Sequence, residues 1–313
     1  MRQAIKNVAI GTGIGIAAAA VIVHFKTRAD ESAHPPVGKF ITVDGVRLHY
    51  IEEGSGNPII LIHGNAMMVQ DFITSGLVKR LAATNRVIAF DRPGFGYSDR
   101  PRTKSWSADR QGELLAQALT ALGITSAVIV GHSIGTQIAL AMALDHPSVA
   151  NRLVLLSGYY YPETRMDAML ATPTTWPVVG DIYRYTVGPL VASAMASTAV
   201  KAMFAPEEPE ARFSSEFPIA LISRPVQLGA SAGDAAQMMA TAATQSSRYG
   251  ELKMPVAIMA GAEDKIVDPD GHAVRLHGDV AGSSLQILPR TGHMVHHTHP
   301  DQVIEAIAVT TPL

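Results

Sequence analysis

Short apolar runs recur along the chain, and between them apolar positions repeat with helical spacing. Runs of about four residues without a polar position are typical of strands buried on both faces of a parallel sheet. They lie at residues 59–62, 87–90, 127–130, 153–156 and 256–259, and a further strand is predicted at residues 285–288. The intervening patterns predict helices over residues 106–122, 134–145, 269–280 and 300–309. This alternation predicts an α/β fold, with a mostly parallel sheet covered by helices on both faces.

A β-hairpin is predicted to open the folded part of the chain. Residues 40–43 and 46–51 flank Asp44-Gly45, a dipeptide that favours the tight turn between two antiparallel strands. The sheet is therefore expected to start antiparallel, near Phe40, before the parallel strands follow.

The N-terminal segment, residues 1–39, differs from the rest of the chain. Residues 7–25 contain no Asp, Glu, Lys or Arg, and as a helix they would reach about 28 Å, close to the roughly 30 Å hydrocarbon thickness of a bilayer. We expect a hydrophobic helix that anchors an exported catalytic domain to a membrane. The alternatives are a cleaved export signal, which would release the domain to the periplasm or the medium, and a buried or interfacial helix. Residues 29–39, with Pro35-Pro36, are predicted to be a linker.

The alternation of strands and helices stops between residues 158 and 252. This segment is rich in Ala, Met and Pro, and its prolines predict short, broken helices. Because structureless loops of such length are uncommon, we expect a helical cap over the carboxyl end of the sheet. The core domain would then consist of residues 40–157 and 253–313.

Composition narrows the function classes. Hydrophobic residues make up 47% and charged residues 17% of the chain, with a mean hydropathy of +0.17, which excludes a disordered protein. With 25 Lys and Arg against 27 Asp and Glu, no basic excess exists to neutralise phosphates, so nucleic acid is not an expected partner. The absence of cysteine excludes disulfides, thiolate metal sites and a cysteine nucleophile.

A serine stands between a predicted strand and a predicted helix, in the pattern Gly131-His132-Ser133-Ile134-Gly135. A nucleophilic serine needs a sharp strand-to-helix turn that exposes its hydroxyl, and the flanking positions must be small to avoid clashes. The N-terminus of the following helix directs amides and a positive dipole toward developing negative charge. The pattern therefore predicts a nucleophile at Ser133.

Four further motifs follow predicted strands. They are His63-Gly64-Asn65, residues 91–99 (DRPGFGYSD), Gly261-Ala262-Glu263-Asp264 and Gly292-His293. Together with the serine motif, they resemble the α/β-hydrolase superfamily, specifically its lid-bearing serine hydrolases, from about residue 40 to the C-terminus. The order serine, acid, histidine is the order that this fold carries.

The resemblance implies a catalytic triad of Ser133, Asp264 and His293. Ser133 would attack a carbonyl carbon, His293 would accept and return the proton, and Asp264 would hold the imidazole. The backbone N–H groups of Asn65 and Ile134 would form the oxyanion hole. This chemistry requires no metal and no organic cofactor.

Other carboxylates compete for the role of Asp264. Glu263, Asp268 and Asp270 lie in the same stretch, but the position directly after the strand favours Asp264. In some members of the superfamily the acid follows the preceding strand. Here that strand is followed by residues 157–159, which contain no carboxylate.

Other histidines compete with His293. His296, His297 and His299 follow it, and such a cluster could bind a metal, but the Gly-His motif of the family favours His293. The other three are expected to line a surface or to begin the last helix. Three more residues in these motifs are expected to be structural: His63, Asp91 and His132, whose side chain should point away from the nucleophile.

The cap is expected to shape the substrate pocket. Few charges and several methionines predict an adaptable apolar pocket, unless these residues only pack the cap against the core: Met166, Met169, Met195, Met203, Met238 and Met239. The sequence of the cap shows no cationic cluster that would indicate a phosphorylated or dianionic substrate. The expected reaction is hydrolysis of small to medium apolar carboxylic esters. The same triad could instead cleave a lactone, an amide or a carbon–carbon bond, although related carbon–carbon hydrolases commonly have Trp at the position of Met294. Further alternatives are a cofactor-free perhydrolase or haloperoxidase reaction and a non-catalytic binding protein.

Overall fold

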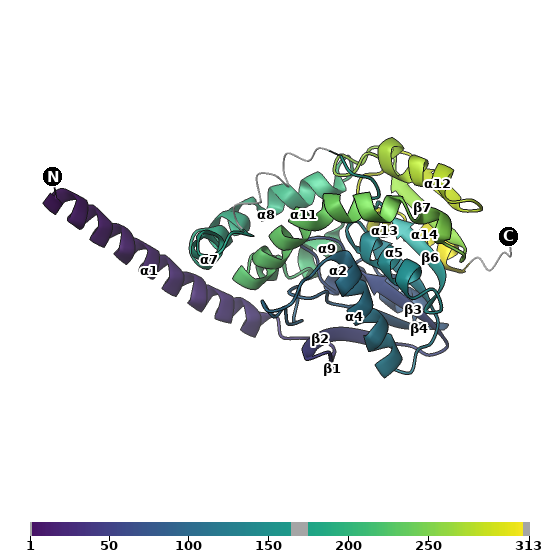
Figure 1. Cartoon of the computed structure of the whole chain (residues 1–313), viewed down its shortest axis with the longest axis horizontal. Coiled ribbons are helices and arrows are strands. Elements are labelled where there is room, and N and C mark those ends of the chain that lie inside the picture. Colours follow the sequence, from purple (N-terminus) through teal and green to yellow (C-terminus); the bar gives the residue numbers. More distant parts are fainter. Residues whose placement is uncertain (1, 164–174, 309–313) are drawn as a thin grey trace.

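The computed structural model describes residues 2–163 and 175–308, without the side chains of residues 2–6 and 8–12. An eight-stranded sheet crosses the protein in the order β1-β2-β4-β3-β5-β6-β7-β8 (Figure 1). The pairs β1–β2 and β2–β4 are antiparallel and the other neighbours are parallel, which confirms the mostly parallel sheet with an antiparallel start. The strands are β1 (Lys39–Val43), β2 (Val46–Glu53), β3 (Asn57–Ile62), β4 (Asn85–Phe90), β5 (Ala127–His132), β6 (Ala150–Leu156), β7 (Val256–Gly261) and β8 (Ser284–Leu288).

Helices cover both faces of the sheet, as predicted. Along β3, Ile60 and Ile62 join one apolar cluster, whereas Ile59 and Leu61 join the other, because successive side chains of a strand point to opposite faces. The first face packs against α4 (Ala108–Ala121), α5 (Gly135–Asp145) and α12 (Arg275–Asp279). The second packs against α2 (Gln70–Thr74), α3 (Leu77–Leu81) and α14 (Pro300–Ala308).

Helix predictions fail where the helices are short. The helices α2, α3 and α13 (Val295–Thr298) have four or five residues each, too few to show a period in the sequence. The predicted helix 269–280 is divided into a π-helical turn, η3 (Asp270–Val274), and α12. The predicted end of the last helix, Val309, lies outside the described residues.

Between β6 and β7 the described residues form helices and no strand. We call residues 158–252 the inserted segment; its helices are α7 (Val179–Tyr185), α8 (Gly188–Phe204), α9 (Ala211–Glu216), α10 (Ile219–Ile222), α11 (Pro225–Ser246) and η2 (Tyr249–Glu251). The prediction of short, broken helices is wrong for α8 and α11, which have 17 and 22 residues. Pro189 and Pro225 lie in their first turns, where the fixed φ of proline favours a helix start. Pro173, Met166 and Met169 lie outside the described residues.

One long helix, α1 (Arg2–Ala33), projects from the body of the protein (Figure 1). It includes the first five residues of the predicted linker 29–39, so the helical part of the N-terminal segment is longer than predicted. Ala29, Glu31 and Ala33 are compatible with a helix, and Lys26 pairs with Asp30 one turn away at 2.6 Å.

The predicted single-span N-terminal anchor is not supported. Among the described residues no one helix combines the length and the apolar character of a membrane span, and only α7 and α8, bent by 64°, meet both conditions as a pair. The C-terminal part of α1 contacts protein instead. Val23 is 2% exposed, and Glu31 pairs with Arg224 of the inserted segment at 3.1 Å.

A buried ion pair joins the inserted segment to the sheet. Arg92, in the loop after β4, is fully buried and pairs with Asp234 of α11. Asp234 also accepts hydrogen bonds from Arg100 at 2.9 Å and from Gln111 at 3.2 Å. Arg92 donates to the carbonyl oxygens of His63 at 3.0 Å and of the following residue, Gly64, at 3.1 Å. One guanidinium therefore connects α11 with the loop that follows β3.

We expect Asp234→Asn to destabilise the protein strongly, because it removes the charge that compensates the buried Arg92. Breaking a buried pair on one side costs about 3–5 kcal/mol, so the free energy of unfolding in urea should fall by that amount. Glu216→Gln is the control, since the Arg212–Glu216 pair on α9 is exposed and such pairs contribute about 0.2–1 kcal/mol. Equal losses in the two variants would contradict a stabilising role of the buried Arg92–Asp234 pair.

Candidate active site

Ser133 occupies a strained turn between β5 and α5. Its φ is +53°, a region that residues other than glycine rarely adopt, and its side chain is partly exposed. The Ser133 N–H donates to the carbonyl oxygen of Leu156, at the end of β6, at 2.9 Å. The turn is thus held against the neighbouring strand at the carboxyl end of the sheet.

Steric limits explain the two glycines of the serine motif. A Cβ atom at Gly135 would lie 2.3 Å from the carbonyl oxygen of Ile62, at the end of β3. A Cβ atom at Gly131 would lie 2.7 Å from the carbonyl oxygen of Gly135. No side chain fits at either position without moving the backbone, so the sharp turn requires both glycines.

The loop after β3 passes directly beside Ser133. A Cβ atom at Gly64 would lie 3.0 Å from the Cβ of Ser133, so Asn65, the next residue, follows close to the serine turn. The Asn65 side chain accepts a hydrogen bond from the Ala66 N–H at 3.0 Å and donates to the carbonyl oxygen of Ser231, in α11, at 3.3 Å. Ile134 is buried at the N-terminus of α5. The two predicted oxyanion residues therefore lie on the two segments that meet at Ser133.

His293 and Asp264 form a buried pair. Their Nδ1 and Oδ2 atoms are 2.7 Å apart, and the residues are 3% and 8% exposed. The other carboxylate oxygen of Asp264 accepts from the N–H groups of Ile266 and Val267 at 2.8 and 3.0 Å. The competing carboxylates are all exposed and none pairs with His293: Glu263, Asp268 and Asp270. Asp264 is thus fixed on one side by the backbone and on the other by the imidazole.

The loop that carries His293 contacts the serine turn through His132. The His132 Nε2 lies 3.1 Å from the carbonyl oxygen of His293, and the two ring centroids are 4.9 Å apart. The same loop touches the end of β7, because a Cβ atom at Gly261 would lie 2.2 Å from the carbonyl oxygen of Gly292. The structure therefore gathers the predicted site residues at the carboxyl ends of β3, β5, β7 and β8.

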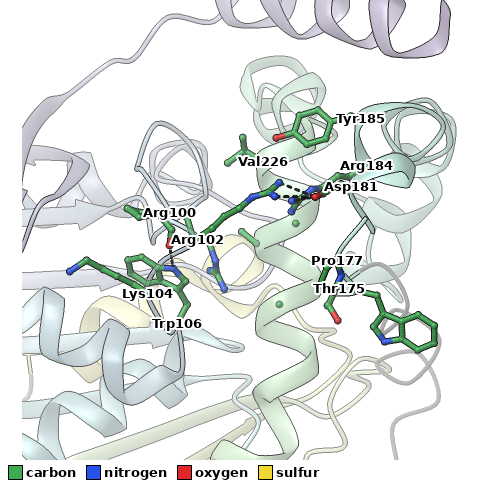
Figure 2. A pocket seen from close by; sticks show the side chains of 15 residues that line it. Arg100, Arg102, Lys104, Trp106, Thr175, Pro177, Asp181, Arg184, Tyr185 and Val226 are labelled. Carbon is green, nitrogen blue, oxygen red and sulfur yellow. Dashed lines mark hydrogen bonds and ion pairs between the residues drawn. The ribbon is translucent and has the colours of Figure 1, made fainter. Parts of the chain in front are cut away.

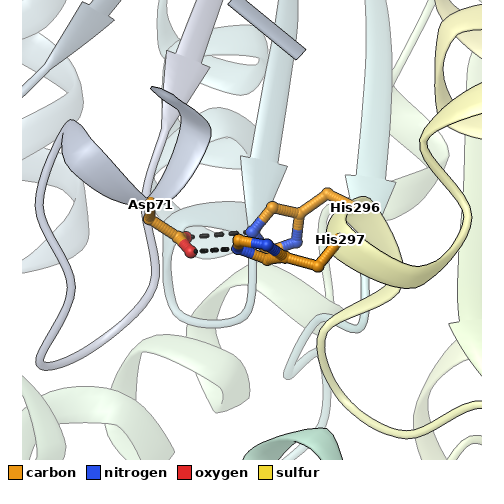
Figure 3. Close-up of side chains that lie close together, drawn as sticks. All are labelled: Asp71, His296 and His297. Carbon is orange, nitrogen blue, oxygen red and sulfur yellow. Dashed lines mark hydrogen bonds and ion pairs between the residues drawn. The ribbon is translucent and has the colours of Figure 1, made fainter. Parts of the chain in front are cut away.

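His296 and His297 do not line a surface, so that prediction is wrong. Both are fully buried in α13, and their Nε2 atoms lie 3.0 and 2.8 Å from the two carboxylate oxygens of Asp71 in α2 (Figure 3). Asp71 was missed because its partners are 225 and 226 residues away. The third competitor, His299, directly precedes α14, as expected.

These three side chains have the composition of a metal site, with all ligand atoms within 4.8 Å of one another. A histidine that binds a metal through Nε2 normally donates its Nδ1–H to a second partner. The Nδ1 atoms of His296 and His297 are buried and have no hydrogen-bond partner in the described part of the chain. Both rings fit the tautomer that donates Nε2–H to Asp71 and leaves Nδ1 unprotonated. The arrangement thus favours a hydrogen-bonded cluster over a metal centre.

His63 and Asp91 support the loops, as predicted. Burial lowers the pKa of His63 to about 4, so the ring is neutral at pH 7, and its Nε2 accepts from the Arg92 N–H at 3.0 Å. Asp91 is fully buried and has three partners: His49 Nδ1 at 2.6 Å, and the N–H groups of Val69 and Tyr97 at 2.8 and 2.9 Å.

A cavity of about 470 Å³ lies between α7, α11 and the loop 100–106 (Figure 2). Its lining includes none of Ser133, Asp264 and His293, so it does not test the expectation of a methionine-lined, weakly charged substrate pocket. Four cations line it, namely Arg100, Arg102, Lys104 and Arg184, together with Trp106 and Trp176. Each cation has an acidic partner: Arg102 and Arg184 pair with Asp181, Arg100 with Asp234, and Lys104 with Asp44. This cluster could not be predicted from the sequence because Arg184 lies far along the chain from the other three cations.

Comparison with known proteins identifies the family of this chain. A family model described as alpha/beta hydrolase fold matches residues 57–300. A 2-hydroxymuconate semialdehyde hydrolase from Pseudomonas sp. (strain CF600) is 39% identical over 139 residues, which cover 43% of this chain and 49% of the relative, so the match spans about half the length of that protein.

Solved structures show the same fold at low sequence identity. A thermophilic esterase from Thermogutta terrifontis has a TM-score of 0.69 at 20% identity and covers 86% of this chain and 97% of its own. An enol-lactonase from Burkholderia xenovorans LB400 has a TM-score of 0.68 at 19% identity, with coverage of 87% and 100%. The relatives compared are hydrolases, and this chain belongs to the α/β-hydrolase fold family.

Proposed function

We propose that this protein is a serine hydrolase that cleaves small to medium carboxylic esters through an acyl-serine intermediate. The observation that carries the proposal is Ser133, held at a φ of +53° in the strand-to-helix turn, whose neighbour His132 bonds to the loop of the buried His293–Asp264 pair. A strained serine turn in contact with the loop of an oriented imidazole fits acyl transfer.

Each residue then has a role in the reaction. Ser133 Oγ attacks the carbonyl carbon while His293 accepts its proton. Asp264 accepts a hydrogen bond from His293 Nδ1–H, which fixes the tautomer and stabilises the imidazolium. The backbone N–H groups of Asn65 and Ile134 stabilise the oxyanion. His293 returns the proton to the leaving alcohol, and water then attacks the acyl-serine by the same steps.

The inserted segment serves in this proposal as a cap, with residues 40–157 and 253–313 as the core and residues 1–39 as a separate N-terminal segment. Support comes from the hydrogen bond between Asn65 and Ser231 of α11, and from the Arg92–Asp234 pair, since both tie α11 to the loops around Ser133. Substitutions in α11 are therefore expected to change which substrate sizes the protein accepts.

Two of the compared proteins support acyl substrates, since one is named an esterase and the other an enol-lactonase.

A second candidate is hydrolysis of a compound such as 2-hydroxymuconate semialdehyde. The observation that favours it is the 39% identity to a hydrolase named for that substrate. A panel of p-nitrophenyl acyl esters, lactones and 2-hydroxymuconate semialdehyde separates the two candidates by their kcat/KM values.

Ser133→Ala is expected to lower kcat for p-nitrophenyl esters by at least about 10³-fold, because no nucleophile remains at the turn. Labelling by a fluorophosphonate should disappear in the same variant. Ser215→Ala, on the exposed side of α9, is the matched control and should keep both properties. Equal turnover by wild type and Ser133→Ala would refute the proposed function.

Asp264→Asn tests the acid separately. The amide cannot hold His293 in the required tautomer, and a loss of about 10⁴-fold in kcat is expected from a comparable replacement in another serine hydrolase. Asp270→Asn, a nearby exposed carboxylate, should change kcat by less than about twofold. If Asp270→Asn or Glu263→Gln causes the large loss and Asp264→Asn does not, the acid has been assigned to the wrong residue.

A further inference from the structure

Asp71 links two segments that flank the candidate site. It lies in α2, seven residues after Gly64, in the stretch that begins with the loop after β3. Its partners His296 and His297 lie in α13, three and four residues after His293. All three side chains are 0% exposed. One carboxylate therefore holds the chain just after His293 against the chain that follows the β3 loop.

A row of imidazole rings connects this cluster with the serine turn. The ring centroids of His297 and His296 are 4.6 Å apart, those of His296 and His132 are 4.3 Å apart, and those of His132 and His293 are 4.9 Å apart. His132 precedes Ser133 in the chain and also bonds to the His293 backbone. A displacement of His296 would thus press on His132, and through it on both the serine turn and the His293 loop, because packed interiors transmit strain.

The charge of Asp71 strengthens the hydrogen bonds of this cluster. Burial disfavours the charged carboxylate, but His296 and His297 outweigh it and hold the pKa of Asp71 well below its ordinary value. Burial lowers the pKa of His296, which favours its neutral form. An ionised carboxylate that accepts two N–H donors forms stronger hydrogen bonds than a neutral acceptor. Moving either ring away would leave a buried charge with one donor fewer.

We propose that Asp71 is a positioning residue of the active site, whose buried carboxylate, held by His296 and His297, sets the place of the His293 loop relative to the Ser133 turn. The proposal rests on the proposed function, since it assigns a consequence to the position of His293. Asp71 itself contacts neither Ser133 nor the substrate and acts through α13 and His132.

The first test compares Asp71→Asn with Leu276→Ala in kinetics on a p-nitrophenyl ester. Asp71→Asn keeps the shape of the side chain but loses the charge, and a small displacement of reacting groups lowers kcat by about 10–100-fold. KM should stay within about twofold, because substrate contacts are unchanged. Leu276→Ala is the stability control, since Leu276 is fully buried in α12 and its truncation destabilises the core without changing a contact of His293. A similar fall of kcat in both variants would overturn the proposal, because it would reflect lost stability alone.

A second pair of variants decides the matter if Asp71→Asn does not fold. His297→Gln replaces the Nε2–H donor by an amide N–H, whereas His297→Leu removes the donor. We expect His297→Gln to keep kcat within about threefold and His297→Leu to lower it by about 10-fold or more, again with little change in KM. Equal kcat values in the two variants would overturn the proposal. A metal analysis that finds one equivalent of metal in the wild type and none in His297→Leu would overturn it as well.

Failure of this inference can be distinguished from failure of the proposed function. The function fails if the wild type shows no turnover that depends on Ser133, whatever Asp71 does. Proton NMR of the wild type and Asp71→Asn gives a readout that needs no substrate. The low-field N–H resonance of the His293–Asp264 hydrogen bond should shift or broaden in Asp71→Asn and stay in place in Leu276→Ala. An unchanged resonance in Asp71→Asn would overturn the positioning role.

Discussion

The close approach of three backbone segments at Ser133 is the constraint on which the rest of the structure depends. The serine turn leaves β5, passes within van der Waals distance of the end of β3, and enters α5. Only glycine fits at positions 131 and 135, and Ser133 itself adopts a φ of +53°. A turn of this kind persists only where its surroundings over-determine it. Here the parallel register of β3, β5 and β6 provides that restraint, with the Ser133 N–H paired to Leu156.

Buried ionic groups hold the loops that surround this turn. Arg92 bonds to the loop after β3 and to Asp234 of α11. Asp91 bonds to three separate segments, through His49, Val69 and Tyr97, and Asp71 bonds to the helix that follows His293. All are fully or almost fully buried. Buried charges contribute little net stability compared with apolar packing. However, a conformation that separates the partners leaves an uncompensated buried charge, which is strongly unfavourable. Buried ionic groups are therefore suited to fix the position of loops that carry the candidate site residues.

Much of the fold was predictable because its signals are local. Four-residue apolar runs mark the parallel strands except β8, and the glycines at 131 and 135 follow from the geometry of a single turn. What escaped prediction depends on distant partners or on short elements. His296 and His297 were expected near the surface because nothing adjacent in the sequence reveals Asp71, more than 200 residues away. Pro189 and Pro225 were expected to break helices, although at the first turn proline favours their start. The cations at the cavity come from separate segments, so only the folded chain shows them together.

The central claim is that Ser133 is the nucleophile of an acyl-transfer reaction. The most direct test is to treat the full-length protein with a fluorophosphonate and to identify the modified residue by mass spectrometry of its peptides. We expect one covalent adduct per chain, on Ser133, formed slowly or not at all in Asp264→Asn. An adduct on a different residue, or no adduct while ester hydrolysis continues, would contradict it.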